Sequence, residues 1–164
     1  MYQASDFSYV KDSVFTHNEA DLDGGGFYLT YPRVSFLNTE FSYNRARRNG
    51  GAGFNIAGEL ILLDSNILSN QADQDGGGIY NNRYMLISRS AFLDDDAQGN
   101  GGGVYHATGS VYSIIESSTF HGNDAVRAEG FSLRRAYRSG IVHFTRTPPM
   151  QAAGARYMVR TPLI

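Results

Sequence analysis

The sequence predicts an all-β fold, a single-stranded, right-handed parallel β-helix of about five coils, each 25–28 residues long. Two observations predict it. Four glycine runs begin 26, 26 and 25 residues apart, at Gly24, Gly50, Gly76 and Gly101. A second pattern, a large apolar residue followed three positions later by Asn or Asp, recurs five times at a similar period. A repeat near 25 residues without helical spacing fits one solenoid coil of short strands and corners. The right-handed sense follows from the general handedness of parallel crossovers.

The pattern aligns in columns, and each column becomes a ladder when coils stack about 4.8 Å apart. The Phe ladder consists of Phe15, Phe41, Ile67, Phe92 and Phe120. The Asn ladder consists of Asn18, Asn44, Asn70 and Asn123, with Asp95 in the same column. We expect the Phe ladder to fill the core, at roughly 1.5–3 kcal/mol for each buried side chain. We expect the Asn ladder to occupy left-handed corners and to bond to the backbone of the neighbouring coil.

Three strands are predicted in each coil. The first covers segments such as Val34–Phe36, Leu60–Leu63 and Met85–Ile87, whose alternation points every second side chain inward. The second reaches the Phe ladder from a hydroxyl residue two positions before it, and the third follows each glycine run. The glycines allow turns with positive φ and let the corners of adjacent coils approach closely.

The repeats define a β-helix domain over residues 5–131, followed by an Arg- and Pro-containing extension, residues 132–164, that we expect to be irregular or poorly ordered. Charge divides in nearly the same way. Residues 1–129 carry eight basic residues against all sixteen acids, a balance of −8, whereas residues 130–164 carry six Arg and no acid. The acidic body argues against nucleic-acid binding. The extension is either a polyanion-binding tail or an unrelated appendage.

Targeting signals are absent from the residues present. The apolar runs are too short to span a bilayer, and residues 1–6 lack the basic and apolar regions of a signal peptide. We therefore expect any export signal to lie outside this chain. Neither end shows a polar cap, which predicts either a monomer or end-to-end stacking of solenoids. There is no Cys, so no disulfide can form.

Paired tetrapeptides give the chain a family resemblance. Phe15–Asn18, Phe41–Asn44 and Phe120–Asn123 read Phe-x-x-Asn, and Gly77-Gly78-Ile79 and Gly102-Gly103-Val104 read Gly-Gly-aliphatic. Over roughly residues 5–131 this resembles the repeat of chlamydial-type polymorphic outer-membrane proteins. The resemblance implies an exported cell-surface passenger with adhesive roles, associated with the outer membrane. The signal peptide and C-terminal membrane barrel of that family have no counterpart here.

One column suggests a binding site. Eight residues after each recurring Ala stands an aromatic residue, and these form the aromatic ladder: Tyr28, Phe54, Tyr80 and Tyr105. Rings exposed along one face would suit a carbohydrate or a cell-surface protein. The alternative is a partly buried ladder that only stabilises its sheet. Alternation leaves the orientation of the rings open, although three phenols favour the outward one.

Acidic residues offer two further candidates. Asp21, Asp23, Asp73 and Asp75 flank glycine runs two coils apart and would supply some of the oxygen ligands of calcium, but Asp-Gly turn chemistry also explains them. The run Asp94, Asp95 and Asp96 is the catalytic candidate, because carbohydrate-cleaving β-helices use clustered carboxylates. Adjacent side chains point apart, however. The four His residues show no metal-ligand spacing.

Three functions remain open. The leading hypothesis is a non-catalytic surface or secreted scaffold that binds through one solenoid face. The second is a fragment of a polysaccharide lyase or glycosidase, and the third is a spacer without a binding site. Uniform coil length favours the non-catalytic classes, because enzymes of this fold wall their substrate groove with long loops.

Overall fold

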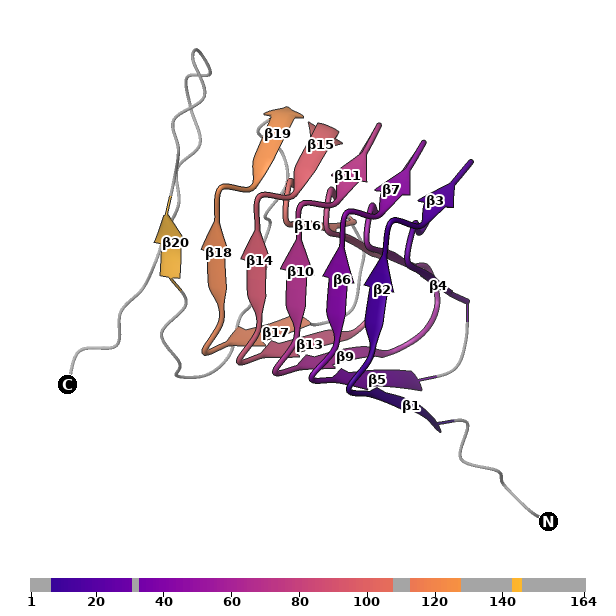
Figure 1. Cartoon of the computed structure of the whole chain (residues 1–164), viewed down its shortest axis with the longest axis vertical. Helices are drawn as coiled ribbons and strands as arrows, with labels where there is room; N and C mark the ends of the chain where they lie inside the picture. The colour runs from indigo at the N-terminus through magenta and orange to yellow at the C-terminus, as the bar shows by residue number, and fades with distance from the viewer. Residues whose placement is uncertain (1–6, 31–32, 108–112, 128–142, 146–164) are drawn as a thin grey trace.

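The computed structural model describes residues 7–30, 33–107, 113–127 and 143–145. These residues form twenty short strands, all paired in parallel, in four sheets (Figure 1). Four coils pass through all four sheets, and a fifth contributes strands to three of them. The predicted parallel β-helix is thereby confirmed. Within the described segments no helix has the length and apolar character needed to cross a membrane.

The first two sheets follow each other around the coil and meet at a sharp corner. Sheet A contains β1 (Phe7–Lys11), β5 (Arg33–Leu37), β9 (Leu60–Leu63), β13 (Met85–Ser88) and β17 (Ser113–Glu116). Sheet B contains β2 (Val14–Thr16), β6 (Glu40–Ser42), β10 (Asn66–Leu68), β14 (Ala91–Leu93), β18 (Thr119–His121) and β20 (His143–Thr145). The last of these comes from the extension and pairs Phe144 with Phe120. The other residues of 132–164 lie outside the described part of the chain.

The other two sheets complete each coil. Sheet C contains β3 (Glu19–Ala20), β7 (Arg45–Ala46), β11 (Gln71–Ala72), β15 (Asp96–Asn100) and β19 (Asp124–Arg127). Sheet D contains β4 (Phe27–Leu29), β8 (Gly53–Asn55), β12 (Ile79–Asn81) and β16 (Val104–His106). Sheet C corrects the prediction of three strands per coil. Most of its strands are only two residues long, too short for side-chain alternation to reveal them.

The strand register matches the sequence columns. Phe41 pairs with Phe15 on one side and with Ile67 on the other, and Ile67 pairs with Phe92. Phe41, Ile67 and Phe92 are fully buried, which confirms the inward direction of the Phe ladder. The N-terminal part of the core is aromatic: Phe41 stacks on Phe15 with ring centroids 4.9 Å apart and meets Phe36 edge to face at 5.0 Å.

Corners follow one rule at two places in the coil. A residue with positive φ comes first, and the next residue has a polar side chain. From Asn44 and from Ser65 onward, that side chain accepts a main-chain N–H of the preceding coil. The left-handed residues of these corners are Asp12, Asn38, Asp64, Arg89 and Ser117, then His17, Tyr43, Ser69, Asp94 and Gly122. The sequence suggested that the residues of the Asn ladder have the left-handed conformation, and this prediction is wrong. The residue before each member takes that conformation, which turns the ladder side chain into the interior.

Both polar ladders provide hydrogen-bond partners for main-chain N–H and C=O groups that would otherwise lack them at the corners. The hydroxyl ladder consists of Ser13, Thr39, Ser65, Ser90 and Ser118. Ser65 Oγ accepts the Thr39 N–H at 3.1 Å and donates to the Leu63 carbonyl at 2.8 Å. In the Asn ladder, Asn70 Oδ1 accepts the Asn44 N–H at 2.9 Å. The predicted bond from this ladder to the neighbouring backbone is thus confirmed.

Candidate binding surface

The aromatic ladder lies on the outer face of sheet D. Strand pairing places Tyr28 beside Phe54, Phe54 beside Tyr80, and Tyr80 beside Tyr105. Their neighbours along the strands, such as Ile79 and Asn81, are fully buried. Alternation therefore directs the four rings outward.

The rings stack on one another rather than spreading over the sheet. Ring centroids are 5.1 Å apart for Tyr28 and Phe54, 4.7 Å for Phe54 and Tyr80, and 5.2 Å for Tyr80 and Tyr105. The first two pairs are inclined by only 23° and 21°. Both faces of Phe54 are covered, and only 5% of this residue is exposed. At Phe54 and Tyr80 the ladder thus presents ring edges and a phenol group, not open ring faces on which a sugar could stack.

Tyr28 differs from the other members because it begins the ladder. It stacks on Phe54 on one side and is 48% exposed. Arg48 is also exposed, and its guanidinium forms an ion pair with Asp23. The hydrogen bond to Asp23 and the charge of Asp23 raise the pKa of Arg48 above its usual value. An exposed phenol and an exposed guanidinium, the latter bound to Asp23 five residues before Tyr28, are therefore both present on the first coils of the solenoid.

A third polar ladder runs along the corner between sheets C and D, one residue before each glycine run. We call it the acid–amide ladder: Asp23, Asn49, Asp75 and Asn100. Asn49 donates to Asp23 Oδ1 from both its main-chain N–H and its Nδ2, each at 3.1 Å. Asn100 makes the same pair of bonds to Asp75 Oδ1, at 2.7 and 3.0 Å. Acids thus alternate with amides, so no two carboxylates are adjacent.

This ladder is visible in the sequence columns, and its two acids, Asp23 and Asp75, belong to the calcium candidate. Asp23 is buried, which acts to raise its pKa, yet its hydrogen bonds and ion pair with Arg48 and its bonds from Asn49 hold the pKa below the usual value. The other acids of the calcium candidate are also paired, Asp73 with Arg45 at 3.1 Å and Asp21 with Arg47 at 3.2 Å. The described segments contain no group of three or more His, Cys, Asp or Glu placed to hold a metal ion.

The alternation makes one substitution informative. Asn49→Asp places a third carboxylate between Asp23 and Asp75 and removes the amide that donates to Asp23. We expect a loss of about 1–3 kcal/mol of unfolding free energy at neutral pH, relieved below about pH 4, where carboxyl groups protonate. Urea unfolding at pH 7 and pH 3.5 measures it. The control is Asn66→Asp at an exposed position of sheet B, and equal losses in both variants would contradict the ladder.

The three acids of the catalytic candidate do not form one site. Asp94 is exposed, Asp95 is fully buried in the Asn ladder, and Asp96 lies on the outer face of sheet C beside Asp124. Burial raises the pKa of Asp96, and the charge of Asp124 raises it further. Since the Asp95 carboxyl faces the interior, no substrate reaches Asp94, Asp95 and Asp96 together.

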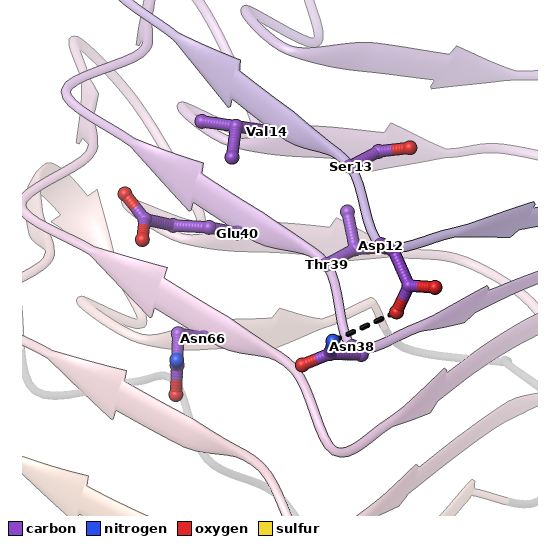
Figure 2. Close-up of a pocket in the computed structure, with 7 residues that line it drawn as sticks. All are labelled: Asp12, Ser13, Val14, Asn38, Thr39, Glu40 and Asn66. Atoms are coloured by element: carbon purple, nitrogen blue, oxygen red, sulfur yellow. Dashed lines mark hydrogen bonds between the residues drawn. The ribbon is translucent and has the colours of Figure 1, made fainter.

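Surface hollows in the described part of the chain are open. One, of about 330 Å³, is lined by Arg33, Glu59, Ile61 and Tyr84 outside sheet A. The other, of about 280 Å³, lies where sheets A and B meet (Figure 2). There Asn38 donates to Asp12 at 2.8 Å, while Val14, Glu40 and Asn66 project from successive strands. Neither hollow has the walls of an enclosed ligand pocket.

Comparison with known proteins gives no relative: no family model, curated protein or solved structure matches the chain. The class defined by the structure is a parallel β-solenoid stabilised by three polar ladders and an aromatic one. Function must be argued from the geometry of its surface.

Proposed function

We propose that this chain is a non-catalytic scaffold of the cell surface or extracellular space that binds a protein partner through the outer face of sheet D. One observation carries the proposal: Tyr28 is exposed at the end of a stacked aromatic ladder, and the exposed Arg48 is bound to Asp23 in the corner that precedes the strand of Tyr28. Tyr and Arg are the residue types most enriched at the energetic centres of protein interfaces. The resemblance to polymorphic outer-membrane repeats supports the location, and its adhesive implication agrees with a binding role.

A protein suits this surface better than a glycan does. Sugar recognition by aromatic residues uses the ring face, and the inner rings of the ladder have both faces covered. The surface instead offers ring edges, phenol hydroxyls and one guanidinium, which together form directional hydrogen bonds with peptide groups and carboxylates. The three strand spacings of the ladder give it a length of about 14 Å, which fits a short extended peptide.

The test compares two exposed aromatic residues. Tyr28→Ala should lower affinity for a peptide-array or cell-surface partner about 30-fold, the equivalent of a hot-spot residue, because Tyr28 has a free surface. Tyr43→Ala removes an equally exposed ring from another corner, 59% exposed, and should leave binding unchanged. Both should melt like the unsubstituted protein to within a few degrees. Wild-type binding that survives Tyr28→Ala, or that Tyr43→Ala abolishes equally, would refute the assignment.

The spacer function is the second candidate, favoured by the burial of Phe54 between two rings. In that case the ladder only stabilises sheet D. The double variant Tyr80→Ala, Tyr105→Ala separates the two. Lost binding with an unchanged melt indicates a binding surface. A large loss of stability, with no partner found for the wild type on cells, glycan arrays or peptide arrays, indicates a structural ladder.

A further inference from the structure

Asp95 occupies a position that its ladder reserves for an amide. The column reads Asn18, Asn44, Asn70, Asp95 and Asn123, and Asp95 is fully buried. Its Oδ1 behaves like an asparagine oxygen, because it accepts the Asn70 N–H at 2.9 Å and Asn70 Nδ2 at 2.8 Å. Its Oδ2 has no hydrogen-bond partner.

The repeat shows what the second oxygen faces. Each amide nitrogen in the column donates to a main-chain carbonyl of the preceding coil: Asn44 to Phe15 at 2.9 Å, Asn70 to Phe41 at 3.0 Å and Asn123 to Phe92 at 2.9 Å. Asn44 also donates to the side-chain oxygen of the next member, Asn70. Asp95 Oδ2 takes the place of this nitrogen, so by the repeat its neighbours are the Ile67 carbonyl and Asn123 Oδ1. Both are hydrogen-bond acceptors. If Asp95 were ionised, its Oδ2 would face these two oxygens with no proton available to form a hydrogen bond.

We propose that Asp95 is a protonated, hydrogen-donating acid in the folded protein at neutral pH, and that its contribution to the stability of the solenoid is larger in mild acid than at alkaline pH. A proton on Oδ2 restores the donor that the other members of the column supply. Burial raises the pKa of Asp95 to about 8, partly offset by the two bonds from Asn70, and the charge of Asp94 raises it slightly.

No cation in the described part of the chain compensates a charge on Asp95. The groups packed against the carboxyl are Asn70 from the preceding coil, Asn123 from the following one and Gly78 across the interior, where an added Cβ would lie 3.1 Å from Oδ2. The charged group acting on it is Asp94, an exposed acid. Among the described residues, therefore, ionisation of Asp95 is opposed by desolvation and by like charge.

The direction of the pH effect follows. An unfolded Asp loses its proton near its ordinary value of 3.8, whereas folded Asp95 keeps it to about pH 8. Between these values the folded state binds one proton more, so raising the pH favours unfolding. The stabilisation is complete below about pH 4 and is lost as the pH rises to about 8. A one-proton difference changes the unfolding equilibrium constant up to tenfold per pH unit.

Asp95→Asn provides the test, because it supplies the missing donor without a titratable group. We expect the ratio of the unfolding constants of wild type and variant to rise up to tenfold per pH unit from pH 4 to pH 8, in urea titrations. Asp94→Asn, the adjacent exposed acid, is the control and should leave the slope of the wild type nearly intact. A ratio for Asp95→Asn that is independent of pH, or that falls as the pH rises, overturns the proposal.

A second measurement does not depend on any variant being stable. Carbon NMR of the carboxyl groups in the folded wild-type protein should show one Asp that remains protonated at pH 6 and titrates well above it. Asp95→Asn, where it folds, should remove that signal. If every Asp of the folded protein titrates below pH 5, Asp95 is ionised at neutral pH and the proposal fails.

Discussion

Phe41→Ala should lower the free energy of unfolding by about 3–5 kcal/mol, the usual cost of removing a fully buried aromatic ring. Phe41 is 0% exposed. Its ring stacks on Phe15 and meets Phe27 at 5.1 Å and Phe36 at 5.0 Å. The cavity left by this truncation would open at the centre of an aromatic cluster, where the stacked coils on either side resist collapse. Chemical denaturation monitored by circular dichroism measures the loss.

Tyr43→Ala is the matched control, because Tyr43 lies two residues away on the outside of the same corner and is 59% exposed. Its truncation removes one ring stack, on His17 at 5.1 Å. This should lower the free energy of unfolding by no more than about 1 kcal/mol. Ser42→Ala is unsuitable as a control, because Ser42 is 3% exposed and its hydroxyl is hydrogen-bonded with Thr16 and Glu40. If Phe41→Ala proved as mild as Tyr43→Ala, the Phe ladder would not carry the core.

The sequence predicted the fold well because coils of nearly constant length stack in register. In such a solenoid any recurring column is also a line of contacts in space. The repeat positions therefore predict that Phe41 contacts Phe15 and Ile67. They predict the contacts within the aromatic ladder in the same way. Few other folds give contacts between residues 25 or 26 positions apart so directly.

The residues with left-handed backbone at the corners could not be predicted from the sequence columns. The left-handed positions hold residues as different as His17, Tyr43 and Arg89, whereas propensity favours Gly or Asn for that conformation. Hydrogen bonds to adjacent coils hold these residues there, for example from the Tyr43 N–H to the Leu68 carbonyl at 3.0 Å. Propensity favoured Asn for the left-handed position of the corner. In the structure the Asn instead follows the left-handed residue, and its side chain points inward.

The candidate surface was predictable in composition but not in accessibility. Its four aromatic positions came from the column, whereas alternation left their orientation open. Their mutual stacking follows from a strand spacing of about 4.8 Å, which leaves room for one ring thickness and no ligand between rings. Hence Phe54 is buried although it points outward, whereas Tyr28, at the end of the ladder, is 48% exposed.

Gly102→Ala should destabilise the protein by about 3 kcal/mol, at the upper end of the range for overpacking. A Cβ at this position would lie 2.4 Å from the main-chain oxygen and 2.6 Å from the main-chain nitrogen of Asp124. These atoms belong to β19 of the next coil, which is held to β15 by sheet pairing. Because backbone cannot rotate away as a side chain can, the coils must separate locally to admit the methyl group.

Gly103→Ala tests the same change one residue later. Its added Cβ would be 3.1 Å or more from the nearest atoms, which belong to the side chains of Asn123 and Phe120. The corresponding residue in the second coil is already Ala52, fully buried, so the corner accepts a methyl group there. We expect Gly103→Ala to cost less than about 1 kcal/mol. Thermal and urea unfolding of the two variants should therefore differ clearly, and equal stabilities would show that close backbone approach at Gly102 does not limit how tightly the coils stack.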